Sequence, residues 1–170
     1  MKIKKIPVPS NSLIAKIQPI SYSDSFEAIV GADCGISLEE IQVEFWASRP
    51  KWAIRLMKLR NILVKPLGLK TDNILSKEHI ESIIESKEVR QGLNLYRKNE
   101  HEIVLYKDDK HLRFYFSVLY DGVKISASTI VQLHNTVGKI YFFFIAPFHF
   151  LLVKWQFKRI LKRLLKTNMK

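Results

Sequence analysis

Histidines are the residues of this 170-residue chain best suited to acid–base chemistry, because an unperturbed imidazole titrates near pH ~6.5. The chain has five, which are His79, His101, His111, His134 and His149. No two of them have the His-x-His or His-Glu-x-x-His spacing typical of a metal site. The only cysteine is Cys34, which excludes Cys-based zinc sites and intramolecular disulfides and favours a reducing compartment. The sequence therefore predicts no metal ion and no cofactor.

His111, His134 and Tyr141 are the candidates for a catalytic acid or base. Alternation of apolar and polar residues predicts that both histidines lie on strands, where they could meet across a sheet. A structural, hydrogen-bonding role is the favoured interpretation of each histidine, and catalysis is the alternative.

Arg60 and Asn61 stand out because they follow a run of leucines at helical spacing. In the favoured interpretation, Arg60 pairs with a carboxylate such as Asp24 and fixes a helix to a strand. In the other, Arg60 and Asn61 orient the polar head of a ligand, since a guanidinium suits a carboxylate or phosphate.

Aromatic side chains are abundant, with ten Phe, six Tyr and three Trp. Most of them must form an ordinary core, but ligand pockets are also mainly apolar with a few placed polar groups. The predicted ligand-binding residues are Trp52, Leu56, Arg60, Asn61, Phe114, Phe116, His134, Tyr141, Phe143, Phe148 and His149.

The elements that must position these side chains begin with a strand, predicted over residues 22–30 from its alternating pattern. A helix is expected to start at Ser37, because Ser37 and Glu40 have the spacing of a capping box. A second helix is predicted from Pro50, and a third, more polar one over residues 76–88.

The second half of the chain predicts an antiparallel meander that runs into a long helix. Apolar residues recur with a period of two from Leu93, and further strands are predicted over 125–133 and 139–145. A helix follows from about Pro147. The uncharged run from Ile140 to Val153 is too short for a bilayer, which needs roughly 20 residues, and predicts a buried strand entering that helix.

The final helix has an apolar stripe and a basic stripe. Phe157, Ile160, Leu161 and Leu164 are predicted to face the sheet, with Lys154, Lys158, Lys162 and Lys166 pointing away. The net charge is +12, and seven basic and no acidic residues lie between positions 141 and 170. A solvated outer face is the favoured interpretation, an anionic membrane surface is the second, and nucleic acid is the least favoured, because no motif for it is present.

The order of strand, helix pair, antiparallel strands and long helix resembles the helix-grip fold of the START and Bet v 1-like (SRPBCC) superfamily. More specifically, the chain resembles the bacterial domain-of-unknown-function 2867 family. The stretches that carry this likeness are Tyr22–Phe26, Arg49–Asn61 with Leu67–Lys70, Asp109–Phe114, and His134–Tyr141 with Ala146–His149. The resemblance implies a curved antiparallel sheet wrapped around a long C-terminal helix, with an apolar cavity between them.

These observations predict that the domain binds an apolar small molecule or lipid in that cavity. We expect a carrier rather than an enzyme. A cyclase- or hydrolase-like enzyme acting on a hydrophobic substrate is one alternative, since helix-grip relatives include such enzymes. Attachment to a membrane through the basic helix is the other.

We expect one domain over residues 1–170, with flexible ends at about 1–12 and 166–170. We expect a cytoplasmic protein. If the basic helix attaches to a membrane, the protein would lie at the inner face of that membrane.

Overall fold

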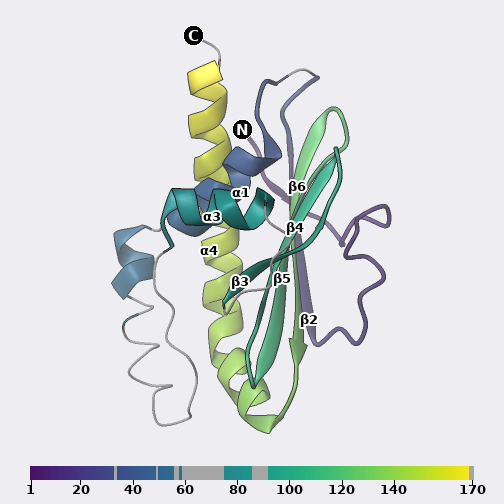
Figure 1. Cartoon of the computed structure of the whole chain (residues 1–170), viewed down its shortest axis with the longest axis vertical. Helices are drawn as coiled ribbons and strands as arrows, with labels where there is room; N and C mark the ends of the chain where they lie inside the picture. Colours follow the sequence, from purple (N-terminus) through teal and green to yellow (C-terminus); the bar gives the residue numbers. More distant parts are fainter. Residues whose placement is uncertain (33, 49, 56–57, 59–74, 86–91, 169–170) are drawn as a thin grey trace.

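The computed structural model describes residues 1–32, 34–48, 50–55, 58, 75–85 and 92–168. In this part of the chain, six strands form one antiparallel sheet in the order β1-β2-β6-β5-β4-β3. The helices lie on one face of the sheet, and the longest of them runs along its length (Figure 1). The chain thus has an α+β, helix-grip-like fold, with an open curved sheet and a long C-terminal helix packed on it.

The strands are β1 Lys4–Lys5, β2 Tyr22–Ile29, β3 Leu93–Lys98, β4 Glu102–Asp108, β5 Leu112–Tyr120 and β6 Lys124–Leu133. The helices are α1 Leu38–Ala47, α3 Lys77–Glu85 and α4 Thr136–Asn168, and residues 51–55 are also helical. The strand over 22–30, the helix after Ser37, the third helix and the meander from Leu93 to Leu133 are therefore confirmed.

The strand β2 closes the meander by pairing with β6, the last strand in the chain. Phe26 is opposite Ala127, and Asp24 is opposite Thr129. Side chains of alternate residues point to the same face of a sheet. Because Phe26 and Ala127 belong to the core under the helices, Asp24 and Thr129 also point toward that concave face.

Two buried glutamines fix the helices to this face. Gln42 of α1 donates its amide to the Ile103 carbonyl at 2.9 Å and accepts from the indole of Trp46 at 3.1 Å. Gln156 of α4 donates to the carbonyls of Phe45 and Ser48 at the end of α1. Hydrogen bonds of this kind are needed because a buried amide without partners is costly. As a result, α1 is held against both the sheet and α4.

The start of α4 corrects the sequence prediction. Residues 139–145 are not a strand, and the helix begins at Thr136 rather than near Pro147. Asn135 caps it, since its side-chain oxygen accepts from the Gly138 N–H at 3.0 Å. The uninterrupted run of apolar residues has no clear period of two or 3.6, so periodicity alone could not distinguish the two structures. Pro147 is accommodated inside the helix on its exposed side.

The N-terminal segment covers the outer face of the sheet. Ile14 and Ile17 pack with Val104, Tyr115 and Ile130 in a second, smaller core. The segment is anchored by the buried carboxylate of Glu102. Residues 4–5, within the stretch expected to be flexible, pair with β2 as strand β1.

Candidate functional site

The candidate site is centred on Asp24, a carboxylate on the concave face of β2. Its side chain is only 1% exposed, so it is almost entirely removed from water. The Tyr22 hydroxyl donates a hydrogen bond to Oδ2 at 2.8 Å. The other oxygen, Oδ1, is buried and has no hydrogen-bond partner among the described residues. An ionised carboxylate can accept about four hydrogen bonds, so Asp24 keeps unused capacity.

Two more buried polar atoms without partners lie next to this carboxylate. Thr129 is directly opposite Asp24 on β6, and its hydroxyl is unpaired in the described structure. His149 of α4 places Nε2 3.8 Å from Asp24 Oδ2, which is too long for a hydrogen bond, and Nε2 is likewise unpaired there. We call Asp24, Thr129 and His149 the polar cluster. It joins two strands and one helix.

Burial controls the charges of this cluster. Burial lowers the pKa of the His149 imidazole below its ordinary value, and the negative charge of Asp24 opposes the change only partly. Burial also raises the pKa of the Tyr22 hydroxyl well above its ordinary value, and the charge of Asp24 and the hydrogen bond to it act in the same direction. Near neutral pH, His149 is therefore uncharged, and Tyr22 remains a hydrogen-bond donor.

Aromatic rings surround the polar cluster on the side of α4. Tyr22 meets Phe142 edge-to-face with ring centroids 5.0 Å apart, and Phe114 meets His149 at 5.4 Å. These apolar walls exclude water and strengthen any hydrogen bond formed inside them. The cluster therefore combines a few polar groups with apolar surroundings, as ligand sites do.

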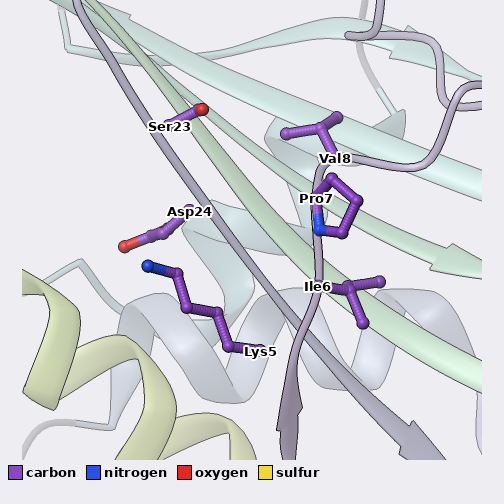
Figure 2. A pocket seen from close by; sticks show the side chains of 6 residues that line it. All are labelled: Lys5, Ile6, Pro7, Val8, Ser23 and Asp24. Carbon is purple, nitrogen blue, oxygen red and sulfur yellow. The ribbon is translucent and has the colours of Figure 1, made fainter.

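A groove lies at the edge of the sheet, and Asp24 is the member of the polar cluster that lines it. It has a volume of about 340 Å³ and is lined by Lys5, Ile6, Pro7, Val8, Ser23 and Asp24. Figure 2 shows the amino group of Lys5 on the same side as the Asp24 carboxylate. The Lys5 amino group also lies 5.2 Å from the centre of the Phe150 ring. We call this opening the edge groove.

Two of the catalytic candidates are neighbours, since the His134 N–H donates to the His111 carbonyl at 2.9 Å. His111 is buried, and its Nδ1 lies 3.0 Å from the side-chain oxygen of Asn135, the residue that caps α4. His134 is more exposed and lies 3.9 Å from Asp108. Tyr141 is half-buried on α4. The contact with Asn135 joins His111 to the start of α4, while the other ring nitrogen of His111, Nε2, is buried without a hydrogen-bond partner among the described residues.

The predicted ligand-binding residues are divided between the interior and the surface. Phe114 and His149 are in contact at the polar cluster, and Phe116 is fully buried in the core, stacked on Phe45. Phe143 is 76% exposed, and Trp52 and Phe148 are also exposed. Leu56, Arg60 and Asn61 lie outside the described residues.

Sequence reasoning missed Tyr22, Thr129 and Lys5 as members or neighbours of the site, and considered Asp24 only as a partner for Arg60. The sequence did contain one indication of the site, because Asp24 is a carboxylate on the apolar face of a strand. Residues 22, 24 and 26 alternate, so Asp24 must share the face of Phe26. No motif marked Thr129 or Lys5.

Comparison with known proteins identifies one family. The pattern of the family described as "Protein of unknown function (DUF2867)" matches residues 17–155, more than three quarters of the chain. The chain belongs to this DUF2867 family. No curated protein and no solved structure matches it significantly. The matched region includes Tyr22, Asp24, Thr129 and His149, and excludes Lys5.

Within the described part of this DUF2867 chain, one helix is apolar and long enough to cross a membrane. Within Thr136–Thr167, an 18-residue window has a mean hydropathy of 1.6, and only 17% of it is buried. The uncharged run was predicted to be a buried strand and helix entry; it is instead helix throughout, and only Phe142 and Val153 in it are buried. Length and composition alone do not separate a membrane helix from a core helix, but the exposed apolar side chains of α4 distinguish it from a fully buried core helix.

Proposed function

We propose that this protein binds an apolar small molecule that carries a hydroxyl or amine group, and that the polar cluster holds this group. The observation that carries the proposal is the set of three adjacent buried polar atoms without partners: Asp24 Oδ1, Thr129 Oγ1 and His149 Nε2. Buried polar atoms in native proteins are nearly always paired, so each exception calls for an explanation. One ligand group placed among them would satisfy all three.

The chemistry of the ligand group follows from the atoms that it would meet. Asp24 can only accept hydrogen bonds, whereas Thr129 can donate and accept. Neutral His149 can take either role at Nε2, depending on its tautomer. A hydroxyl matches this set because it donates to Asp24 and can also accept from a neighbour, and a protonated amine matches it because it can donate to Asp24 and to Thr129. A carboxylate or phosphate does not, because it would be repelled by Asp24.

The edge groove supports the apolar character of the rest of the ligand. Its volume of about 340 Å³ lies within the usual range for small-molecule sites, roughly 300–1,000 Å³. Ile6, Pro7 and Val8 offer an apolar wall next to Asp24. A hydrocarbon body in this groove would lie beside Asp24, the member of the polar cluster that lines it.

The substitution Thr129→Val tests the proposal because valine has nearly the same shape as threonine but no hydroxyl. Removing an unpaired buried hydroxyl should leave the ligand-free protein as stable as before, or more stable by about 1 kcal/mol. The same change should lower the amount of small molecule that stays bound when the protein is isolated from cell extract. Native mass spectrometry measures the bound mass, and urea unfolding measures the stability.

Ser128→Ala is the matched control. Ser128 is the neighbouring residue on the opposite face of β6, and its hydroxyl is paired with Ser25 at 2.7 Å. This variant should lose stability and keep its bound compound. A wild-type protein that captures no compound of any kind would contradict the proposal. So would Arg60→Ala if it destabilised the ligand-free protein as much as Asp24→Asn, because Arg60 would then be the partner of Asp24.

A further inference from the structure

The outer face of α4 exposes a continuous set of large apolar side chains. Phe143 is 76% exposed, Phe144 65%, Leu151 58% and Ile140 56%. Phe148 and Trp155 belong to the same set, and Trp155 contacts the exposed Trp52 edge-to-face with centroids 6.1 Å apart. Single exposed apolar residues are ordinary, but contiguous patches mark interaction sites. We call this set the apolar face.

Helical geometry places these side chains in one row. Positions 140, 144, 148, 151 and 155 follow one another at intervals of three or four residues, which is the spacing of a single helix face. The opposite face of the helix, with Phe142, Val153 and Phe157, is buried against the rest of the protein. The exposure therefore belongs to the side that points away from the sheet.

The same row changes from apolar to basic toward the C-terminus. Lys154, Lys158, Lys162 and Lys166 continue it and are all exposed. Arg159 lies 5.4 Å from the centre of the Trp155 ring, where the two parts meet. No Asp or Glu follows Asp121 in the sequence, so α4 itself contributes no negative charge. Arg163 is not part of this surface, because it is paired with Glu44 at 2.5 Å.

We propose that the outer face of α4 binds the surface of a membrane that contains anionic lipids. Charge complementarity identifies the partner: the lysines match negatively charged head groups, and the aromatic residues match the acyl boundary beside them. Trp155 and Trp52 lie between the two regions, and tryptophan is enriched at the membrane interface. This inference is independent of ligand binding at the polar cluster.

The arrangement of the two parts also sets the orientation of the helix. Ile140 to Trp155 spans about 22 Å along a helix at ~1.5 Å per residue. This is shorter than a bilayer core of about 30 Å. The apolar part therefore enters one leaflet while the basic part stays among the head groups. The helix lies oblique to the membrane, with its first turns deepest.

Sedimentation with vesicles tests the proposal on the full chain. The wild-type protein should sediment with vesicles of phosphatidylcholine and phosphatidylglycerol, and much less with phosphatidylcholine alone. The double variant Phe143→Ser/Phe144→Ser should lower the partition coefficient at least about tenfold. Lys158→Gln/Lys162→Gln should lower it about fivefold for each lysine on the anionic vesicles.

Matched controls separate this surface from general effects. Ile29→Ser removes another large exposed apolar side chain, from the end of β2, and should leave binding unchanged. Lys16→Gln removes one charge from an exposed position on the N-terminal segment, outside α4, and should change the partition coefficient less than twofold.

Three results would overturn the proposal. The first is equal binding to neutral and anionic vesicles. The second is absence of vesicle binding together with a dimer that Phe143→Ser/Phe144→Ser converts to a monomer, which would make a second copy the partner. The third is protein in cell membranes that resists an alkaline carbonate wash, which would indicate a helix that crosses the bilayer.

Discussion

At the scale of single residues, two buried carboxylates are treated differently by this fold. Glu102 is fully used: Oε1 accepts from the hydroxyls of Ser12 and Ser117, and Oε2 accepts from the Leu13 N–H at 2.7 Å. Asp24 accepts one hydrogen bond from Tyr22 and has an unpaired oxygen. Glu102 holds the N-terminal segment to the sheet, whereas among the described residues Asp24 makes no hydrogen bond to another element. This difference favours a ligand-binding role for Asp24 over a structural one.

The pH dependence of stability should report His149. Burial lowers the pKa of His149 in the folded protein below about 6.5, its ordinary value. The unfolded chain therefore takes up the proton first as the pH falls. The free energy of unfolding should decrease below pH ~6.5 and stop decreasing, for this group, below the lowered pKa.

Urea unfolding between pH 5 and 8 measures this dependence, and His149→Gln should flatten it. His101→Gln is the control, since His101 is exposed and its loss should leave the slope unchanged. Parallel curves for wild type and His149→Gln would contradict the prediction.

At the scale of elements, the junction between β5 and α4 explains why the helix starts where it does. The capping residue Asn135 also contacts His111 and donates its amide to the Lys110 carbonyl at 3.2 Å. Gly138 passes so close to the His111 backbone that a Cβ atom there would overlap the carbonyl oxygen. The first turn of α4 is therefore fitted against the start of β5.

Gly138→Ala should destabilise the protein, although alanine is normally favoured over glycine in a helix by about 1 kcal/mol. The added methyl group would force the two backbones apart, which costs about 1–3 kcal/mol in a packed position. Thermal unfolding followed by circular dichroism would measure the loss. Lys139→Ala, at the next, exposed position, should be neutral; an equal loss there would mean that Gly138 is not special.

The sequence predicted the elements whose pattern is decided locally. The capping box of Ser37 and Glu40 and the alternation from Leu112 to Tyr120 are local patterns, and both elements were confirmed. The start of α4 was wrong because the apolar run after it has no clear period, and because Asn135 and Gly138 fit against residues 110–111, far away in the sequence. The polar cluster could be predicted only in part, since Thr129 and His149 meet Asp24 through strand register and helix packing.

At the scale of the whole molecule, one carboxylate links three helices to one another. Glu44 of α1 binds Lys77 of α3 and Arg163 of α4. Burial raises the pKa of the Glu44 carboxyl, but hydrogen bonds and charges from Lys77 and Arg163 outweigh it and hold that pKa below its ordinary value. The contact therefore connects three helices that are separated in the sequence.

Glu44→Gln should lower the free energy of unfolding at pH 7 by about 1–3 kcal/mol, because two charged partners lose their carboxylate. A lowered pKa in the folded state means that the stabilisation is present above pH ~4.5 and is lost as the pH falls through that lower value. The difference from wild type should thus shrink in acid. A difference that stays constant from pH 7 to pH 3 would contradict this explanation.

The pairing of β2 with β6 has a consequence for synthesis of the chain. Phe26 emerges from the ribosome about 100 residues before its partner Ala127, at roughly 5–20 residues per second. For several seconds β2 has an unpaired edge and an uncovered apolar face, which is the state most prone to misassociation. Completion of the sheet must wait for β6, so the nascent protein depends on its last strand and helix to pair the edge of β2 and cover its apolar face.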